Sequence, residues 1–425
     1  MRKIYTFLAY LIMPLVLIRL CWKAYIRKQK VSRLKERFGY VDTRNQGGIW
    51  LHAVSVGETI AAVPLVKKLQ AQYPELPIVI TTMTVTGAER VAALFDDRIL
   101  HCYVPYDLPA ALHRFITRKK PKILIIMETE IWPNLLSVCQ QRKVPILLAN
   151  ARLSAKSLRG YQKIGFWMRK LLPALNYIAA QTKDDAERFS ALGASPQQLV
   201  ITGSVKFDMT VPESARQQAQ VFSERFGMRP VWIAASTHEA EEDIIVRSAH
   251  QVLQQLSDAL LLWVPRHPER FSKVMSLAKK QGFTVGLRSS EEVIPPTTQI
   301  VIGDSMGELL AYYAASDVAF VGGSLVPTLG GHNLLEPAML NLPVISGPHL
   351  FNFTEIFRLL QEADAMRIVH DAESLANSVI TLLQDGALRA RLGSRGLQVV
   401  QQNLGAVDKH MALIAALLNH QEEKQ

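Results

Sequence analysis

The sequence predicts an α/β protein built from two doubly wound parallel-sheet domains, and three observations support this fold class. The chain has 425 residues, more than the roughly 250–300 residues that one hydrophobic core usually serves. Short apolar stretches alternate with stretches of helical spacing, which is typical of parallel βαβ units. The alternation occurs in two series, and the segment 203–227 between them has the composition of a linker.

The composition indicates an anionic partner and a reducing compartment. The formal net charge is +11, which favours nucleic acid, an acidic membrane surface or a phosphorylated substrate as the partner. Cys21, Cys102 and Cys139 are too few and too scattered for a disulfide framework or a zinc site. Their number therefore favours the cytoplasm.

The N-terminal segment decides between these partners. Residues 4–18 are almost wholly apolar, and basic residues follow at Arg19, Lys23, Arg27, Lys28, Lys30, Arg33, Lys35 and Arg37. A full span needs about 20 residues, so the run is marginal unless 20–22 are included and Arg19 snorkels. No small-residue cleavage site follows, which argues against a removed signal peptide. We expect residues 1–22 to anchor the chain and the basic segment 23–46 to face anionic lipid from the cytoplasm. The alternative is a buried helix of the globular part.

The first series of elements predicts an N-terminal domain at 47–210. Strands are expected at 49–54, 78–82, 99–104, 123–127, 146–149, 177–180 and 199–202. Helices are expected at 59–69, 87–94, 110–117, 131–141, 158–172 and 184–192. Gly57 is expected to break the chain between the first strand and the first helix.

The second series predicts a C-terminal domain at 211–425. Strands are expected at 231–235, 260–264, 299–302, 318–321, 343–346 and 366–369. The last helical pattern, 394–420, is long enough to pack back across a cleft between the two domains.

Several enzyme classes are disfavoured by missing motifs. No G-x-G-x-x-G follows the first strand, and the chain has no G-x-x-x-x-G-K-[ST] and no H-E-x-x-H. A dinucleotide oxidoreductase, a P-loop NTPase and a zinc hydrolase of that type are therefore unfavoured.

Carboxylates follow two of the expected strands. Glu58 stands where the first strand turns into a helix, and Glu128 and Glu130 follow the strand at 123–127. Ligands of open α/β sheets lie at the carboxyl ends of the strands, and neighbouring carboxylates resist joint ionisation. The alternatives are that Glu58 only complements the helix macrodipole, and that one acid of the pair caps the helix near Trp132.

Cations follow two further turns. Lys206, at the expected domain junction, could hold a carboxylate or phosphate, or stabilise charge in a transition state; a solvated linker lysine is the alternative. Arg266 and Arg270 lie beside a helix that Pro268 would open, which favours a phosphate site. His267 between them could be a base, but a hydrogen-bonding partner is the more common role.

Two glycine-containing turns in the second series suit a nucleotide. Backbone N–H groups at 306–308 could bind a base or phosphate, and the paired glycines at 322–323 would let the backbone approach a ligand. Asn333 is expected to open a helix facing phosphate, with Glu336 placed to accept from ribose hydroxyls. A plain turn with a helix cap explains each motif equally well when it stands alone.

Six segments together resemble the motifs of bacterial Kdo transferases, in the order in which that family carries them. They are LHAVSVGET (51–59), METEIWPN (127–134), GSVKFD (203–208), VPRHPERF (264–271), GDSMGEL (303–309) and GGHNLLEP (330–337). These enzymes are lipid A 3-deoxy-D-manno-octulosonic acid (Kdo) transferases, inverting glycosyltransferases of the GT-B fold. The resemblance covers essentially the whole chain.

The resemblance implies a role for each candidate residue. It makes Glu58 the catalytic base and Glu128 and Lys206 stabilisers of the transition state. It assigns binding of CMP to Pro265 and Arg266, to Met306, Gly307 and Glu308, and to Asn333, Leu334, Leu335 and Glu336. One tension remains, because a helix N-terminus lowers the pKa of Glu58, whereas Glu128 or desolvation would raise it.

The resemblance also implies the substrates and the location. The N-terminal domain would bind the lipid A precursor (lipid IVA) and the C-terminal domain the donor CMP-Kdo, for lipopolysaccharide core biosynthesis on the cytoplasmic side of the inner membrane. No metal, other cofactor or nucleic acid is implied. The alternatives are another GT-B enzyme, such as a UDP-sugar transferase or a nucleotide-sugar epimerase, and a non-catalytic, membrane-tethered nucleotide-binding protein.

Overall fold

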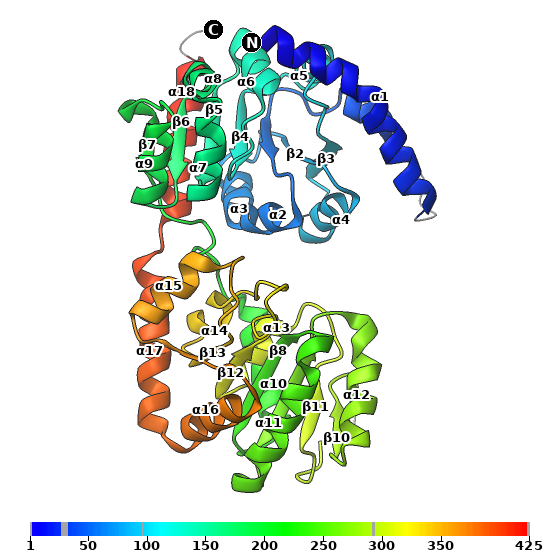
Figure 1. Cartoon of the computed structure of the whole chain (residues 1–425), viewed down its shortest axis with the longest axis vertical. Helices are drawn as coiled ribbons and strands as arrows, with labels where there is room; N and C mark the ends of the chain where they lie inside the picture. The colour runs from blue at the N-terminus through cyan, green and yellow to red at the C-terminus, as the bar shows by residue number, and fades with distance from the viewer. Residues whose placement is uncertain (1, 27–32, 96, 291–293, 423–425) are drawn as a thin grey trace. The chain divides into compact units, whose positions relative to one another are not determined.

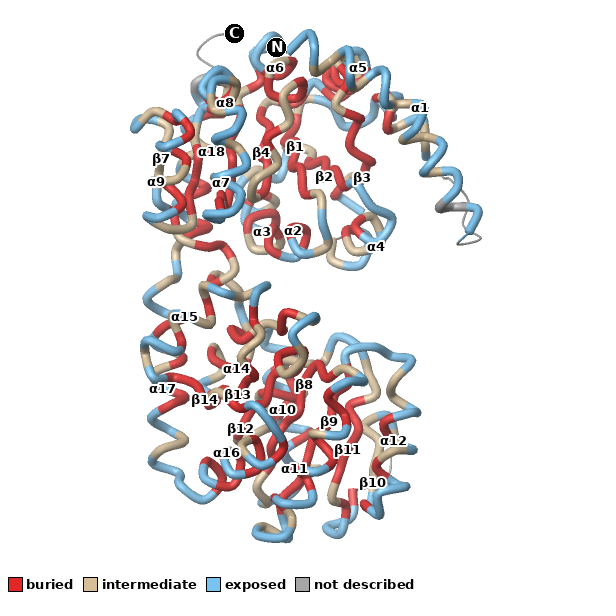
Figure 2. Tube along the Cα trace, viewed as in Figure 1, coloured by how far each residue is buried: buried red, intermediate tan, exposed pale blue. Residues whose placement is uncertain are grey.

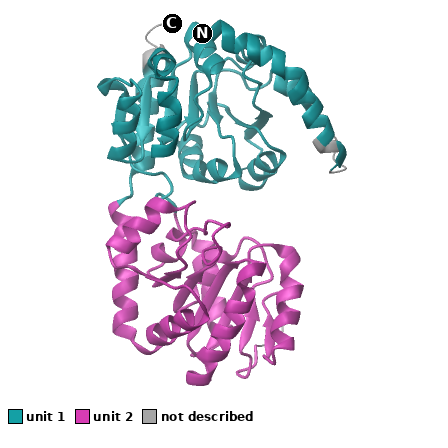
Figure 3. Cartoon of the chain, in the orientation of Figure 1, with its two compact units in different colours: residues 1–209, 403–425 teal, residues 210–402 magenta. Residues whose placement is uncertain are grey.

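The computed structural model describes residues 2–26, 33–95, 97–290 and 294–422. The chain forms two compact units, residues 1–209 with 403–425 and residues 210–402 (Figure 3). The sequence suggested a division at 210/211, and the structure places it at 209/210. Residues 403–425, expected as part of the C-terminal domain, belong to unit 1. The basic residues Arg27, Lys28 and Lys30 lie outside the described residues.

Unit 1 contains a parallel seven-stranded sheet in the described part of the chain (Figure 1). The strand order is β3-β2-β1-β4-β5-β6-β7, so the chain reverses direction across the sheet between β1 and β4. The strands are β1 (Ile49–His52), β2 (Ile78–Thr82), β3 (Ile99–Tyr103), β4 (Ile123–Met127), β5 (Ile146–Ala151), β6 (Tyr177–Ala180) and β7 (Leu199–Ile201). These strands confirm the first predicted series, with end shifts of one or two residues.

Helices cover both faces of this sheet. They are α1 (Arg2–Ile26), η1 (Leu34–Phe38), α2 (Val56–Ala61), α3 (Val63–Gln72), α4 (Val85–Leu94), α5 (Pro109–Lys119), α6 (Pro133–Gln141), α7 (Ala155–Gln162), α8 (Gly165–Leu171), η2 (Leu172–Ala174), α9 (Lys183–Ala191), η3 (Pro196–Gln198) and α18 (Ala406–Glu422). Two large buried apolar clusters result, and most strand residues other than those of β7 are buried, while the outer sides of most helices stay exposed (Figure 2). Met411, Ile414 and Leu417 of α18 complete one cluster.

Three helix predictions for unit 1 were wrong. Gly57 does not break the chain but lies inside α2, because Ser55 caps the helix by accepting a hydrogen bond from the Glu58 N–H. The expected helix at 59–69 is divided at Ala62, ahead of Pro64, and the one at 158–172 is divided into α7 and α8. Proline suits the first turn of a helix and disfavours its interior.

Unit 2 contains a second parallel seven-stranded sheet among its described residues, in the order β10-β11-β9-β8-β12-β13-β14. Its strands are β8 (Val231–Thr237), β9 (Leu260–Pro265), β10 (Val285–Leu287), β11 (Ile300–Ile302), β12 (Val318–Val321), β13 (Val344–Ser346) and β14 (Met366–Ile368). The edge strand β10 was not predicted. Here the direction of the chain reverses between β8 and β12.

The helices of unit 2 cover its sheet, and a large apolar cluster among the described residues is buried against one face of that sheet. They are α10 (Glu213–Phe226), η4 (Glu239–Glu241), α11 (Glu242–Gln255), η5 (Pro268–Arg270), α12 (Phe271–Lys280), α13 (Leu309–Ala314), α14 (Leu335–Met339), α15 (Thr354–Glu362), α16 (Ala372–Gln384) and α17 (Gly386–Gln402). The continuous final helix expected at 394–420 was wrong. The helical conformation is interrupted at Gly405, whose φ is 92°. The helices on either side, α17 and α18, belong to different units.

Candidate active site

The topology of unit 1 brings the predicted acidic residues together. Glu58 follows β1 and Glu128 follows β4, and these strands are neighbours in register from Ile49–Ile123 to His52–Ile126. They flank the point where the strand order reverses, which is where open α/β sheets bind ligands. Glu130 follows in the same loop, so three carboxylates lie at one edge of the sheet.

Glu58 is buried and held by its own helix start. Its Oε1 accepts from the Ser55 hydroxyl (2.7 Å) and its Oε2 from the Val54 N–H (2.8 Å). The spacing S-x-x-E is that of a capping box, but the box is incomplete, because Glu58 accepts from the N–H of Val54 and not from that of the N-cap Ser55. Burial nevertheless raises the pKa of Glu58, against the lowering by the hydrogen bonds from Ser55 and Val54. With a smaller rise due to Glu128 and Glu130, the pKa of Glu58 comes to about 7. Burial therefore resolves the tension left by the helix dipole.

Glu128 has a strained backbone and a cationic partner. Its φ of 58° lies in the left-handed region, which costs a residue other than glycine energy and is found mostly at functional sites. Its Oε1 lies 3.9 Å from Nζ of Lys206, and both side chains are half-buried. Lys206 is thus not a solvated linker lysine. The structure brings Glu58, Glu128 and Lys206 into one site within unit 1.

Neither acid of the pair caps the next helix. Oδ1 and Oδ2 of Asp107 accept from the N–H groups of Leu135 (2.7 Å) and Asn134 (3.1 Å) at the start of α6. Glu130 instead accepts from Nε1 of Trp132 (2.8 Å), and burial raises its pKa. The capping alternative for the pair was wrong, because a carboxylate distant in sequence already occupies the helix end.

Unit 2 also has an acidic residue where its strand order reverses, but there the carboxylate binds backbone N–H groups of the protein. Glu241 follows β8 and the paired glycines follow β12, again at the reversal of strand order. The fully buried Glu241 carboxylate accepts from the N–H groups of Gly323 (2.7 Å), Ser324 (3.0 Å) and Leu325 (3.0 Å), and from that of His238 (3.2 Å). These backbone donors are therefore engaged inside the protein. That the paired glycines let the backbone approach a ligand stays a prediction, but the N–H groups of Gly323 to Leu325 already have a partner in Glu241.

Arg266 follows β9 next to three histidines. Its backbone N–H donates to the Thr237 carbonyl (3.0 Å), and its side chain is exposed, while Pro265 is buried. Nε2 of His238 lies 2.9 Å from Nε2 of His332, and the ring of His267 meets that of His238 edge-on. Burial lowers the pKa of His332 to about 3 and also lowers that of His238. One neutral ring therefore donates to the other.

Arg270 does not contribute to a phosphate site. Its guanidinium donates to Glu242 through Nε (3.0 Å) and Nη2, and its Nη1 lies 2.8 Å from Glu239. Both partners precede or begin α11, so the prediction for Arg270 was wrong. Arg266 remains as the exposed arginine of this turn.

In the turn at 306–308 the residues Met306 and Gly307 are exposed, whereas the Glu308 carboxylate is engaged within the protein. The φ of Gly307 is 89°. The Glu308 carboxylate accepts from Nη2 of Arg288 (2.6 Å), from the Tyr312 hydroxyl (3.1 Å), and from Ser305 and Gln218. This network fixes the turn against the body of unit 2.

The segment 333–336 forms a compact turn before α14. Oδ1 of Asn333 accepts from the Leu335 N–H (3.1 Å), and its Nδ2 donates to Glu336 (3.2 Å). The helix begins at Leu335, two residues later than expected, and Leu334 and Leu335 are buried. Burial raises the pKa of Glu336 to about 7. The Gly331 N–H donates to the Gly323 carbonyl (2.7 Å), which ties this segment to the loop that Glu241 holds.

Three functional positions escaped the sequence analysis. Glu241 and Arg288 hold the two loops of unit 2, and Asp107 caps α6. The sequence could have identified Glu241, because it is an acidic residue shortly after an apolar strand, as Glu58 is. Arg288 and Asp107 act on distant segments and leave no local pattern. Within the described residues, no group of three or more His, Cys, Asp or Glu side chains is arranged to hold a metal ion.

Comparisons with known proteins bear on this site. A family model described as 3-deoxy-D-manno-octulosonic-acid transferase (kdotransferase) matches residues 32–209. The 3-deoxy-D-manno-octulosonic acid transferase of Haemophilus influenzae is 43% identical over 422 residues, 98% of this chain and 99% of that protein. The enzyme of the same name from Bordetella pertussis is 37% identical over 84% of each chain. A crystal structure of a glycosyltransferase from Rickettsia africae, 14% identical, shares the fold with a TM-score of 0.56 over 88% of this chain and 99% of that one.

Proposed function

The chain belongs to the family of 3-deoxy-D-manno-octulosonic acid (Kdo) transferases, and from this premise we propose that it transfers Kdo from CMP-Kdo to lipid IVA. The reaction is a step of lipopolysaccharide core biosynthesis at the cytoplasmic leaflet of the inner membrane. Family membership makes the chain a glycosyltransferase of the GT-B fold. The proposal adds the acceptor, the inverting mechanism and the residues.

The observation that carries the mechanism is the environment of Glu58. Its carboxylate is buried and oriented by two hydrogen bonds, and its pKa of about 7 balances the ionised and protonated forms near neutral pH. A general base works best with a pKa near the working pH. Glu58 takes the proton of the acceptor hydroxyl, and the oxygen attacks the anomeric carbon of Kdo. The bond from that carbon to the phosphate oxygen breaks, its electron pair leaves with CMP, and this single displacement inverts the configuration.

Glu128 and Lys206 support this step as a pair. Their separation of 3.9 Å places a cation beside the carboxylates, where it stabilises negative charge that develops during transfer. The strained backbone of Glu128 fixes the orientation of its side chain.

Donor binding is assigned to unit 2. The exposed Arg266 beside Pro265 meets the phosphate, the backbone of Met306 to Glu308 meets the nucleotide, and the turn from Asn333 to Glu336 meets the remainder of CMP. We propose that the reaction needs no divalent cation, because Arg266 and backbone N–H groups supply the positive charge.

The test combines product mass with one matched pair of variants. Purified full-length protein is incubated with lipid IVA and CMP-Kdo in buffer with EDTA, and the lipid is analysed by mass spectrometry. Wild type is expected to add one or two Kdo units. Glu58→Gln should lose about 10²–10⁴-fold in rate, the usual contribution of a general base, while it still binds CMP.

The control is Glu187→Gln, which removes an exposed carboxylate of α9 in the same unit and should leave the rate unchanged. Absence of product with wild type would overturn the acceptor or donor assignment. Full activity of Glu58→Gln would keep the family and dismiss the base, and activity only without EDTA would contradict metal independence.

A further inference from the structure

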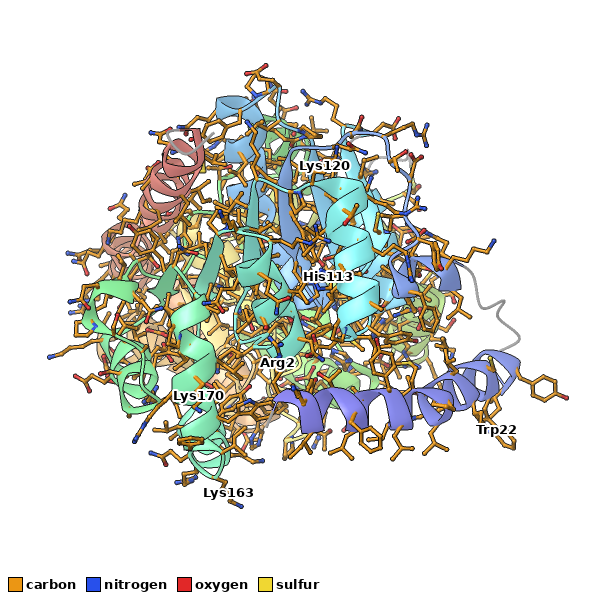
Figure 4. The ribbon with its side chains drawn as sticks, turned by 90° about the horizontal axis from the view of Figure 1, so that it is seen from above. Arg2, Trp22, His113, Lys120, Lys163 and Lys170 are labelled. Atoms are coloured by element: carbon orange, nitrogen blue, oxygen red, sulfur yellow. The ribbon has the colours of Figure 1, made fainter. Side chains whose placement is uncertain are left out.

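Helix α1 packs against the rest of unit 1 through one narrow stripe of side chains, and its broad apolar face is exposed. Its partly buried side chains recur at helical spacing at positions 5, 6, 9, 13, 16, 17 and 20, and its other described side chains are exposed. Ala9, Met13, Val16 and Leu17 pack against Tyr106, Leu108 and Ala111. The partly buried positions run from 5 to 20; Figure 4 shows α1 with Arg2 at one end and Trp22 near the other.

Polar contacts fasten the first turn to the body of unit 1. The Tyr5 hydroxyl donates to Asp107 (2.8 Å), and the Thr6 hydroxyl donates to the buried Asn134 (2.8 Å). The Tyr5 ring meets Trp167 of α8 edge-on, with ring centroids 5.4 Å apart. Asp107 is the residue that caps α6, so the attachment reaches the framework of the domain. A helix that left unit 1 to cross a bilayer would lose this contact along its length.

The length of the uncharged part of α1 also disagrees with a span. The helical segment Arg2–Trp22 is long and apolar enough by composition to be a candidate membrane span, with a mean hydropathy of 2.0. Its uncharged part, residues 4–18, rises only about 22 Å at about 1.5 Å per residue, short of the roughly 30 Å hydrocarbon core. Basic residues flank both ends, Arg2 and Lys3 on one side and Arg19 on the other. With the two units in the cytoplasm, a span would carry Arg2 and Lys3 to the outer side, while the larger group of basic residues after the helix would stay inside, so the positive-inside rule by itself permits a span.

The outward face has the chemistry of a membrane interface. Phe7, Leu11 and Leu15 are 66%, 62% and 65% exposed. Phe166 of α8, close to the Trp167 that Tyr5 contacts, is exposed as well, and Nζ of Lys170 lies 4.5 Å from its ring centroid. Figure 4 shows Lys163 and Lys170 on the side of Arg2 away from Trp22. An apolar face with cations beside it fits the boundary between acyl chains and anionic headgroups.

We propose that α1 does not span the membrane but lies flat in its cytoplasmic interface as part of unit 1. The face of Phe7, Leu11, Leu15 and Phe166 enters the acyl boundary, while Lys163 and Lys170 meet anionic headgroups. The inference rests on the membrane location proposed above and adds the orientation of the enzyme on the bilayer. It also places the N-terminus in the cytoplasm.

The side of the membrane on which the N-terminus lies is the first test. Lys3→Cys is made in a Cys21→Ser background, because Cys102 and Cys139 are buried, and spheroplasts are treated with a membrane-impermeant maleimide before and after lysis. We expect labelling only after lysis. Wild-type Cys21, exposed near the other end of α1, is the matched control, because both orientations keep it in the cytoplasm.

Labelling of Lys3→Cys in intact spheroplasts, with unlabelled Cys21, would establish a span and overturn the proposal while leaving the proposed function intact. Recovery of the chain in the soluble fraction would instead overturn the membrane location itself. The two failures are therefore distinguishable.

The second test measures how deeply positions along α1 lie in the bilayer, and it does not depend on maleimide labelling. Nitroxide labels at Phe7, Leu11 and Leu15 in anionic vesicles should report one shared shallow depth by oxygen accessibility. Labels at Ala9, Met13 and Val16 should be protected, so the values oscillate with a period of about 3.6 residues. A depth that is greatest at Leu11 and falls toward both ends would contradict the flat orientation. Spin–spin broadening in place of lipid accessibility would assign the face to a second copy of the chain.

Discussion

At Glu58 two opposing effects act on one carboxyl group. The first turn of α2 and the hydrogen bonds from Ser55 and Val54 favour the carboxylate, whereas burial disfavours it. Burial is the larger effect and raises the pKa of Glu58 to about 7. The start of the helix therefore fixes the carboxylate of Glu58 in place, and the pKa of Glu58 suits it to act as a base.

This balance predicts the pH dependence of the reaction. The base must be ionised, so kcat/KM should rise with pH, pass its midpoint near 7 and level off above it. Ser55→Ala removes a hydrogen bond that lowers the pKa of Glu58, so its midpoint should move to higher pH. Initial rates between pH 5.5 and 9 measure both curves. A flat wild-type profile, or a downward shift in Ser55→Ala, would contradict the role of Glu58.

At the scale of the element, a buried carboxylate organises the glycine-rich loop after β12. Glu241 engages three consecutive N–H groups of that loop, and Gly323 in turn binds Gly331 ahead of the segment 333–336. A side chain at Gly323 would place its Cβ 2.8 Å from the His332 ring, at a φ of 69°. Glu241 therefore shapes the loop from within, and the exposed Arg266 is the side chain that we propose to meet the anionic donor.

Glu241→Gln tests this role. One carboxylate oxygen becomes an NH₂ group, which opposes either the N–H groups of Ser324 and Leu325 or those of Gly323 and His238. We expect the free energy of unfolding to fall by about 1–3 kcal/mol, the cost of unsatisfied buried polar groups. The KM for CMP-Kdo should rise about tenfold, which corresponds to ~1.4 kcal/mol of binding, with the KM for lipid IVA unchanged.

The matched control for Glu241 lies two residues away. Glu239→Gln alters an exposed carboxylate of the same 3₁₀ turn and should change neither KM. Denaturant unfolding and initial rates provide the two readouts. A Glu241→Gln variant with wild-type donor KM would restrict Glu241 to a purely structural role.

At the scale of the molecule, both units place their acids at the reversal of strand order. Unit 1 keeps Glu58, Glu128 and Lys206 at that edge, and unit 2 uses the corresponding edge to hold its donor loops through Glu241. Unit 1 also carries α1, so the unit in which we propose the base is also the unit that we propose to meet the membrane. Confinement of enzyme and lipid to one surface raises their effective concentration.

The surface of α1 should therefore control lipid kinetics. Phe7→Ser with Leu11→Ser removes two exposed apolar side chains without uncovering Tyr106 or Leu108, which a deletion of 1–22 would do. We expect binding to anionic vesicles to fall by at least about 100-fold, since two such side chains together contribute about 3–6 kcal/mol when buried. The KM for vesicle-embedded lipid IVA should rise, and the KM for CMP-Kdo should stay constant.

Val221→Ser changes an exposed apolar side chain of α10 in unit 2 and serves as the control for surface apolarity in general. Vesicle flotation and initial rates with varied lipid and donor measure the outcome. Unchanged lipid KM in the double variant would dismiss α1 as the membrane contact.

Much of the fold and of the site could be read from the sequence alone, because local patterns determine them. Short continuous apolar runs, alternating with stretches of helical spacing, identified thirteen of the fourteen described strands, and their carboxyl ends carried Glu58, Glu128, Arg266 and the turn at 306–308. The short edge strand β10 was missed, because three half-buried residues give little periodic signal.

Tertiary structure decided which of these groups are engaged and by whom. Arg270 and Glu308 carry the charges of ligand-binding residues, yet Glu242 and Arg288 engage them. Burial of Glu58, the occupation of the glycine loop by Glu241 and the packed stripe of α1 depend on segments distant in the chain. A sequence window records the charge and apolarity of a side chain, whereas its pKa and its partners follow from the atoms that folding places around it.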